Sequence, residues 1–285
     1  MTKVSVFNFS GIYETMYGEG DYSALWDALG GVPACFINMK ELPGTSCYCD
    51  ADAAKQISDV LKKHDSARIH LIDSGNYHYL SLFFLRMIEE PFRLIVFDNH
   101  TDMQPPAFGG LLSCGGWVLE ALETLPGLAE LWLIGPDEES IAAVPGLSGE
   151  SAWNEKKLRF LSREVLENWR REGVLNRKTA EWIREGFAIP AQNVLPSVPL
   201  SGGVYISVDK DVLSETYART SWSQGDLALD ELIGMVGQVM ASMKEAGLTA
   251  AGIDICGESE KHDDAGCVLG RQTNERIMEF LKGWL

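Results

Sequence analysis

The chain has 285 residues, 46% of them hydrophobic, and its 41 acidic and 24 basic residues give a formal net charge of −17 at pH 7. This length is enough for a large buried core, and we expect one domain over residues 1–285. The negative charge argues against binding to nucleic acid or to an anionic membrane surface. The sequence has no apolar run of the roughly 20 residues that span a bilayer and no signal-peptide pattern, and its six cysteines are too dilute for a disulfide scaffold. We therefore expect a cytoplasmic protein.

Apolar runs typical of buried strands alternate with amphipathic stretches along almost the whole chain. Eight strands are predicted, at residues 3–9, 34–39, 68–73, 93–98, 130–135, 158–162, 204–209 and 250–255. Apolar residues recur at helical spacing between them, at residues 50–64, 79–90, 116–125, 163–174, 179–186, 229–247 and 274–285. This alternation predicts βαβ units and therefore a mainly parallel sheet covered by helices.

Acidic residues gather where two of the predicted strands end. The run RLIVF leads into FDNHTD, in which Asp98, His100 and Asp102 stand two apart and would point the same way if the chain stays extended. Asp209 and Asp211 repeat this spacing in SVDKD, after the run GGVYIS. Because parallel strands end at the same edge of a sheet, we expect the two groups to meet there.

A third segment, SGNYHYLS, places His78 just after a strand and before a helix that begins near Tyr79. Any one of these residues alone is more often a helix cap or a packed side chain. Together, two imidazoles and four carboxylates suit two divalent ions such as Mn²⁺, although other divalent ions are possible. Two such ions roughly 3.5 to 4 Å apart can hold a bridging hydroxide, so hydrolysis is the expected chemistry. The predicted metal ligands are His78, Asp98, His100, Asp102, Asp209 and Asp211.

These motifs resemble those of the ureohydrolase family, which includes arginase, agmatinase and formimidoylglutamase. FDNHTD is similar to the family's DAHxD motif, SVDKD and the long loop after it to SxDxD, and SGNYHYLS to GGDHS. The resemblance spans residues 68–260 and agrees in order and spacing. It implies an α/β fold, a three-layer α/β/α sandwich with a mainly parallel sheet of about eight strands, which deacetylases share. It also implies two Mn²⁺ ions as cofactors.

The resemblance also assigns a role to each ligand. One ion would be held by His78, Asp98, Asp102 and Asp209, and the other by Asp98, His100, Asp209 and Asp211. Asp98 and Asp209 would then bridge the ions. Asp102 would act as a catalytic residue that orients the hydroxide and helps to move its proton.

The positions that contact substrate in the family are altered in this chain. The family's shuttle histidine is absent, and its nearest equivalent is Cys114, whose thiol could be acidified at a helix start or could simply be buried. His262 is a second candidate for this shuttle. Gly257 stands where the family has a glutamate that recognises guanidinium, and the neighbouring Glu258 could take its place through a bulge.

The loop after SVDKD departs from the family as well. Arg219 could pair with a carboxylate or phosphate of the substrate, and Trp222 could form a wall of the pocket or stack on a cation. An arginine on the loop surface with a tryptophan packed under it is the alternative.

The sequence therefore predicts a Mn²⁺-dependent hydrolase that cleaves a non-peptide C–N bond in a small guanidino, amidino or related compound. Because Cys114 and Gly257 alter the positions that serve guanidinium chemistry, arginine itself is not the expected substrate. One alternative is a deacetylase-like metal amidohydrolase, although the paired histidines of that group are absent. Another is a metal-binding protein without catalytic activity. A small-molecule substrate is the expected partner, and a homo-oligomer is possible because oligomers are usual in the family.

Overall fold

The computed structural model describes residues 4–18, 27, 30–64, 67–106, 109–144, 146–147, 157–188, 200–261 and 263–283. Eight strands form one sheet in the order β2-β1-β4-β10-β9-β5-β7-β8, and every pair of neighbours is parallel. The strands are β1 (Val4–Asn8), β2 (Ala34–Asn38), β4 (Ile69–Leu71), β5 (Phe92–Phe97), β7 (Leu128–Ile134), β8 (Lys157–Leu161), β9 (Gly203–Asp209) and β10 (Ala250–Cys256). The predicted parallel sheet is confirmed.

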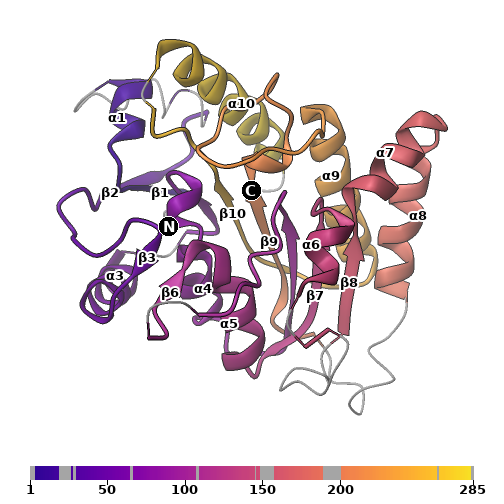
Figure 1. Ribbon diagram of the computed structural model, residues 1–285, viewed down its shortest axis with the longest axis horizontal. Helices are drawn as coiled ribbons and strands as arrows, with labels where there is room; N and C mark the ends of the chain where they lie inside the picture. The colour runs from indigo at the N-terminus through magenta and orange to yellow at the C-terminus, as the bar shows by residue number, and fades with distance from the viewer. Residues whose placement is uncertain are drawn as a thin grey trace.

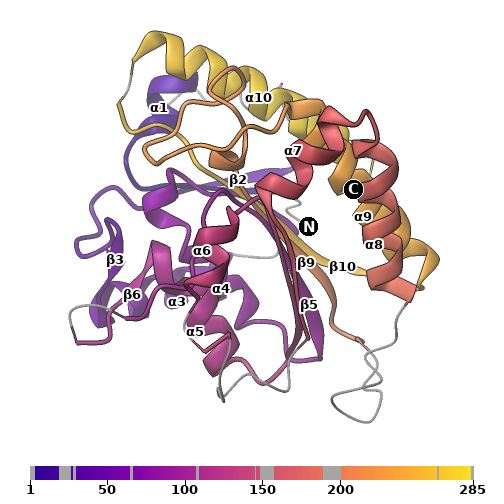
Figure 2. The ribbon, with the colours of Figure 1, turned by 45° about the vertical axis from the view of Figure 1, so that its right-hand side comes forward.

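Helices cover both faces of the sheet, which makes three layers (Figures 1 and 2). One face packs against α1 (Ile12–Tyr17), α7 (Arg163–Arg171), α8 (Leu175–Ala188), α9 (Leu229–Glu245) and α10 (Asp264–Lys282). The other face packs against α3 (Ala51–His64), α4 (Leu80–Leu85) and α5 (Trp117–Thr124). A short helix, α6 (Glu138–Ala142), follows β7. None of the helices in the described ranges has the length and apolar character needed to cross a bilayer.

The central strands explain why the sheet lies inside the molecule. Every residue of β5 and of β9 is buried. Side chains of β5 alternate between the two cores: Ile95 and Phe97 join one, and Leu94 and Val96 join the other. Continuous apolar runs of this kind are typical of strands that are covered on both faces.

Several local features differ from the sequence prediction, and the short helices α1 and α6 were not predicted. The last helix begins at Asp264, ten residues before the predicted start, because Asp263 caps it by accepting a hydrogen bond from the Gly266 amide. A short antiparallel pair, β3 (Tyr48–Cys49) and β6 (Leu112–Ser113), was not predicted. Two-residue strands carry too little periodic pattern to be recognised in a sequence.

Four adjacent strands, β4, β10, β9 and β5, determine where the acid-rich segments meet. In their pairing register Phe97 of β5 lies opposite Val208 of β9, and Asp209 lies opposite Cys256 of β10. The residues that follow these strands therefore emerge side by side at the carboxyl edge of the sheet. The one-turn helices η1 (Gly75–Tyr77) and η3 (Lys210–Val212) follow β4 and β9 at this edge.

Candidate metal centre

The structure brings all six predicted ligands together at the carboxyl edge of the sheet. The four aspartates and His78 are buried, and the His100 side chain is one-third exposed. Ligand atoms of His78, Asp98 and Asp102 lie within 4.8 Å of one another, and those of Asp98, His100 and Asp211 form a second such group. Asp98 belongs to both groups.

His78 turns its Nδ1 atom toward the carboxylates. This nitrogen lies 3.1 Å from Asp102 Oδ2, 3.3 Å from Asp98 Oδ2 and 3.4 Å from Asp209 Oδ2. Its Nε2 atom is 2.9 Å from Ser207 Oγ, and the Ser207 hydroxyl donates to Asp254 Oδ1 at 2.6 Å. Because the hydroxyl has only one proton, Ser207 accepts from Nε2–H, and Nδ1 is the nitrogen available to an ion.

His100 also turns its Nδ1 atom toward the carboxylates. Its Nδ1 atom lies 2.8 Å from Asp211 Oδ2 and 3.5 Å from Asp98 Oδ1. Its Nε2 atom is 2.8 Å from Ser223 Oγ. Each imidazole therefore presents one nitrogen to the carboxylates while a serine hydroxyl holds the other.

Asp102 reaches the site through a bend that follows β5, so the chain does not stay extended over the three residues Asp98, His100 and Asp102. Its φ angle is +48°, in the left-handed region that aspartate tolerates better than most residues. Trp117 Nε1 donates to Asp102 Oδ2 at 2.7 Å, and the Val118 amide donates to its carbonyl oxygen at 3.0 Å. The start of α5 therefore fixes this carboxylate in place.

The carboxylates crowd enough negative charge into the site to shift their own pKa values. Burial and the charge of Asp98 raise the pKa of Asp102, and the same two causes raise the pKa of Asp209 to about 6. Burial and Asp209 raise the pKa of Asp211. Burial opposes a charged His100, but hydrogen bonds to Asp211 and Asp98 outweigh it and raise the pKa of His100 to about 11.

This donor set fits divalent cations. Four ionised carboxylates carry four negative charges, which two divalent ions would neutralise and so relieve the repulsion. Oxygen and imidazole ligands suit Mn²⁺ and neighbouring ions of the same series.

The six side chains line one pocket with a cavity volume of about 110 Å³. Its other lining residues in the described part of the chain are uncharged. They are Cys47, Tyr48, Gly75, Gln104, Ser113, Cys114, Gly115 and Trp222.

Solved structures of other proteins share this architecture. Proclavaminate amidino hydrolase from Streptomyces clavuligerus aligns over 98% of this chain and 91% of its own, with a TM-score of 0.59 and 17% identity. The agmatine ureohydrolase of Thermoplasma volcanium aligns over 99% and 92%, with a TM-score of 0.59 and 16% identity. Arginase from Bacillus caldovelox aligns over 98% of both chains, with a TM-score of 0.58 and 14% identity. The fold is that of the ureohydrolases.

Sequence comparison adds another relative. An uncharacterized protein of Thermotoga maritima is 23% identical over 257 residues, which cover 90% of this chain and 80% of the relative. No protein-family model matches the chain. The resemblance in the motifs is thus confirmed at the level of the ureohydrolase fold.

Cys114 lines the pocket of this ureohydrolase fold, but its thiol is not acidified. Burial raises the pKa of Cys114, and the charge of Asp102 raises it further. The helix that begins at Cys114 is a single turn, η2 (Cys114–Gly116), and α5 begins only at Trp117. Of the two alternatives for Cys114, the structure favours the buried thiol over the acidified one, and a catalytic role or contact with a substrate stays a prediction.

Glu258 does not reach the pocket. Its carboxylate is buried and lies 2.5 Å from Lys210 Nζ, and Asn274 Nδ2 donates to it at 2.7 Å. At Gly257 φ is +96°, and a Cβ atom there would lie 2.4 Å from Asp209 Oδ1. The chain thus has no room for the glutamate that the ureohydrolase pattern places at position 257.

The remaining predicted residues divide between the pocket and its surroundings. Trp222 lines the pocket with its ring edge-on to His100, at a centroid separation of 6.2 Å, and its Nε1 donates to Asn76 Oδ1 at 3.0 Å. Arg219 does not line the pocket and lies 3.6 Å from Asp263. His262 lies outside the described residues.

The sequence prediction missed several residues that contact the ligands. Ser207 contacts His78, and Asp254 in turn contacts Ser207. Ser223 contacts His100. Cys256 ends β10 next to His78. Strand alternation is a signal that finds Ser207, because it lies two residues before Asp209 on β9.

Proposed function

We propose that this protein is a divalent-metal-dependent hydrolase of a non-peptide C–N bond in a small guanidino, amidino or related compound. The observation that carries the proposal is the convergence of four buried aspartates and two imidazoles in one pocket of a ureohydrolase fold. Solved structures with this fold include enzymes named as an amidino hydrolase, an agmatine ureohydrolase and a formimidoylglutamase.

Asp98 has the geometry of a bridging ligand. Its Oδ2 atom faces His78 at 3.3 Å and its Oδ1 atom faces His100 at 3.5 Å. In the proposed centre, His78, Asp98, Asp102 and Asp209 hold one Mn²⁺ ion, and Asp98, His100, Asp209 and Asp211 hold the other. Ions bound there would lower the pKa of a coordinated water molecule and supply the nucleophile.

Asp102 is placed to handle the proton of this reaction. It lines the pocket, and its Oδ2 atom lies 3.1 Å from His78 Nδ1. A carboxylate beside the bound ions could accept the proton of a coordinated water molecule, which is the role of a general base. Trp117 Nε1 holds one oxygen of Asp102 in position.

The pocket favours a small substrate without a free amino-acid end. The cavity of about 110 Å³ has room for a small organic group beside the ligands. Apart from the six proposed ligands, the described lining residues are uncharged, so no side chain among them would pair with an α-carboxylate or α-ammonium group. Burying such groups without a partner is unfavourable. Arginine is therefore not the proposed substrate.

The test is release of urea, ammonia, formamide or acetate by Mn²⁺-loaded protein from a panel of guanidino, formimino and amide compounds, with acetylated amines included for a deacetylase-like reaction. We expect turnover of at least one guanidino or amidino compound. Asp98→Ala should reduce it at least about 1,000-fold, because this residue faces both imidazoles. Asp59→Ala on α3, which is remote from the pocket, is the control and should retain full activity. No release from any compound by protein that carries two ions per chain would contradict the proposal.

A further inference from the structure

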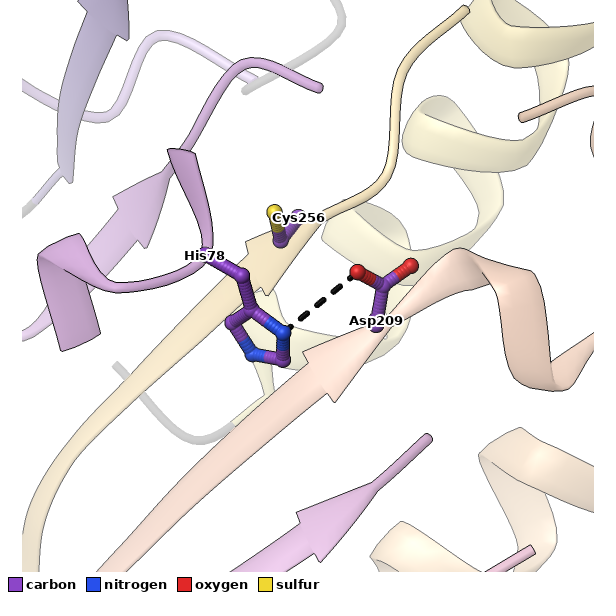
Figure 3. Close-up of side chains that lie close together, drawn as sticks. All are labelled: His78, Asp209 and Cys256. Carbon is purple, nitrogen blue, oxygen red and sulfur yellow. Dashed lines mark ion pairs between the residues drawn. The ribbon is translucent and has the colours of Figure 1, made fainter. Parts of the chain in front are cut away.

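Cys256, the last residue of β10, places a buried thiol beside the proposed ligands. Its Sγ atom, a ring nitrogen of His78 and a carboxylate oxygen of Asp209 all lie within 4.8 Å of one another. Figure 3 shows the three side chains, with His78 and Asp209 on either side of the strand end that carries the thiol. Cys256 is fully buried, and its Sγ contacts the Ser74 carbonyl oxygen at 3.2 Å.

The sheet fixes the position of this thiol. β10 lies between β4 and β9, and Cys256 is opposite Asp209 in the pairing register. Asp254, two residues earlier on β10, holds Ser207, which in turn accepts from His78 Nε2. Because residues two apart on a strand face the same side, one face of β10 supports the histidine through Asp254 and presents the Cys256 sulfur next to it.

The separation of these atoms is compatible with one shared ion. Ligand atoms bound at about 2.0 to 2.3 Å from the same ion lie roughly 3 to 4.5 Å apart as the coordination angle widens from 90° to 180°. The three atoms here all lie within 4.8 Å of one another, close to this range. The two other thiols close to the site, Cys47 and Cys114, line the pocket but belong to no such group among the described residues.

We propose that the Cys256 sulfur is an additional ligand of the ion held by His78 and Asp209. This inference rests on the proposed function only in requiring that the pocket binds divalent ions. Coordination replaces the S–H bond by a sulfur–metal bond, and the proton leaves to the buffer. The ion at His78 then has nitrogen, oxygen and sulfur ligands, whereas the ion at His100 has nitrogen and oxygen ligands only.

The two positions consequently differ in the metals that they prefer. Thiolate ligands favour borderline ions such as Zn²⁺, Co²⁺ and Fe²⁺, while carboxylates and imidazole also suit Mn²⁺. The position at His78 should bind Zn²⁺ or Co²⁺ much more tightly than Mn²⁺, and the position at His100 should discriminate less. Cys256→Ser should remove most of this difference.

The experiment is the absorption spectrum of Co²⁺-loaded protein together with the Co²⁺ content per chain. A thiolate bound to Co²⁺ gives a charge-transfer band in the near ultraviolet that oxygen and nitrogen ligands do not give. We expect this band in the wild-type protein, its loss in Cys256→Ser and Cys256→Val, and its retention in Cys114→Ser. Cys256→Val keeps an apolar side chain of similar size in the core, so that a folding defect can be separated from the loss of a ligand.

Two results would overturn the proposal: two bound Co²⁺ ions without the band in the wild-type protein, or a band that persists in both Cys256 variants. Both would leave the metal centre and the proposed function intact. A protein that binds no Co²⁺ or Mn²⁺ at all would contradict the metal centre itself, and the proposed function with it. A titration of both metals into Cys256→Ser, with an expected loss of at least about tenfold in Co²⁺ affinity at one position, gives an independent readout.

Discussion

Replacing Glu258 by alanine should destabilise the protein strongly, because it would leave a buried ammonium group without its counter-ion. Lys210 is 1% exposed and Glu258 is 3% exposed, and their charged atoms are 2.5 Å apart. Asn274 bonds to both, accepting from Lys210 Nζ at 3.0 Å. Removing one partner of a buried ion pair typically costs about 3 to 5 kcal/mol, and the amide of Asn274 cannot supply the missing charge. We expect a loss in this range.

The assay is urea unfolding of the metal-free protein at pH 7. Glu275→Ala, an exposed carboxylate on α10, is the matched control and should stay within about 0.5 kcal/mol of the wild type. The double variant Lys210→Met and Glu258→Met should recover most of the stability, because an apolar pair of similar volume often replaces a buried ion pair without loss. An unfolding free energy of Glu258→Ala within about 1 kcal/mol of the wild type, combined with a raised KM, would refute this reasoning and restore Glu258 as a substrate contact.

Three further changes test other parts of the structure. Burial lowers the pKa of His70 to about 3, below the value of about 6.5 in an unfolded chain, so the unfolded state binds more protons and stability falls as the pH drops from 6.5 toward 3. The free energy of unfolding falls by at most about 5 kcal/mol over this range. His70→Phe should therefore make the free energy of unfolding less dependent on pH, and an unchanged pH dependence would contradict the lowered pKa of His70. Gly257→Ala should lower the free energy of unfolding by at least about 2 kcal/mol in the same assay and weaken Mn²⁺ binding. The reason is that φ is +96° at this position and the new Cβ atom would meet Asp209. Wild-type stability together with wild-type Mn²⁺ affinity would contradict this geometry. Ser207→Ala should weaken Mn²⁺ binding by about 10- to 100-fold in calorimetric titration, whereas Ser5→Ala, which removes the corresponding bond to His70, should leave it unchanged.

The fold and the proposed ligands could be predicted because local patterns specify both. Continuous apolar runs identify β5 and β9 as buried parallel strands, and the topology rule then places their carboxyl ends at one edge. Asp98 comes directly after β5, and Asp209 is the last residue of β9. Their convergence therefore follows from the sheet alone. His78 follows β4, two strands away from β9 in the sheet, and arrives at the same edge for the same reason.

The substrate side of the pocket could not be predicted because long-range contacts determine it. Glu258 pairs with Lys210, which follows β9, and at Gly257 φ is positive and a Cβ atom would meet Asp209. Cys114 was expected at a helix start, but a single turn precedes α5, and burial raises the pKa of the thiol. The contact of Cys256 with the ligands depends on the strand order, in which β10 lies between β4 and β9.

In the proposed function, Asp98 and the two imidazoles hold two divalent ions in one pocket. The most direct measurement is the metal content of purified protein after equilibrium dialysis against Mn²⁺, with Asp98→Ala dialysed in parallel. Two ions per wild-type chain and fewer than one per Asp98→Ala chain are the predicted result, since each imidazole faces one oxygen of this carboxylate. A wild-type protein without stoichiometric Mn²⁺, or an Asp98→Ala variant that retains both ions, would contradict the account.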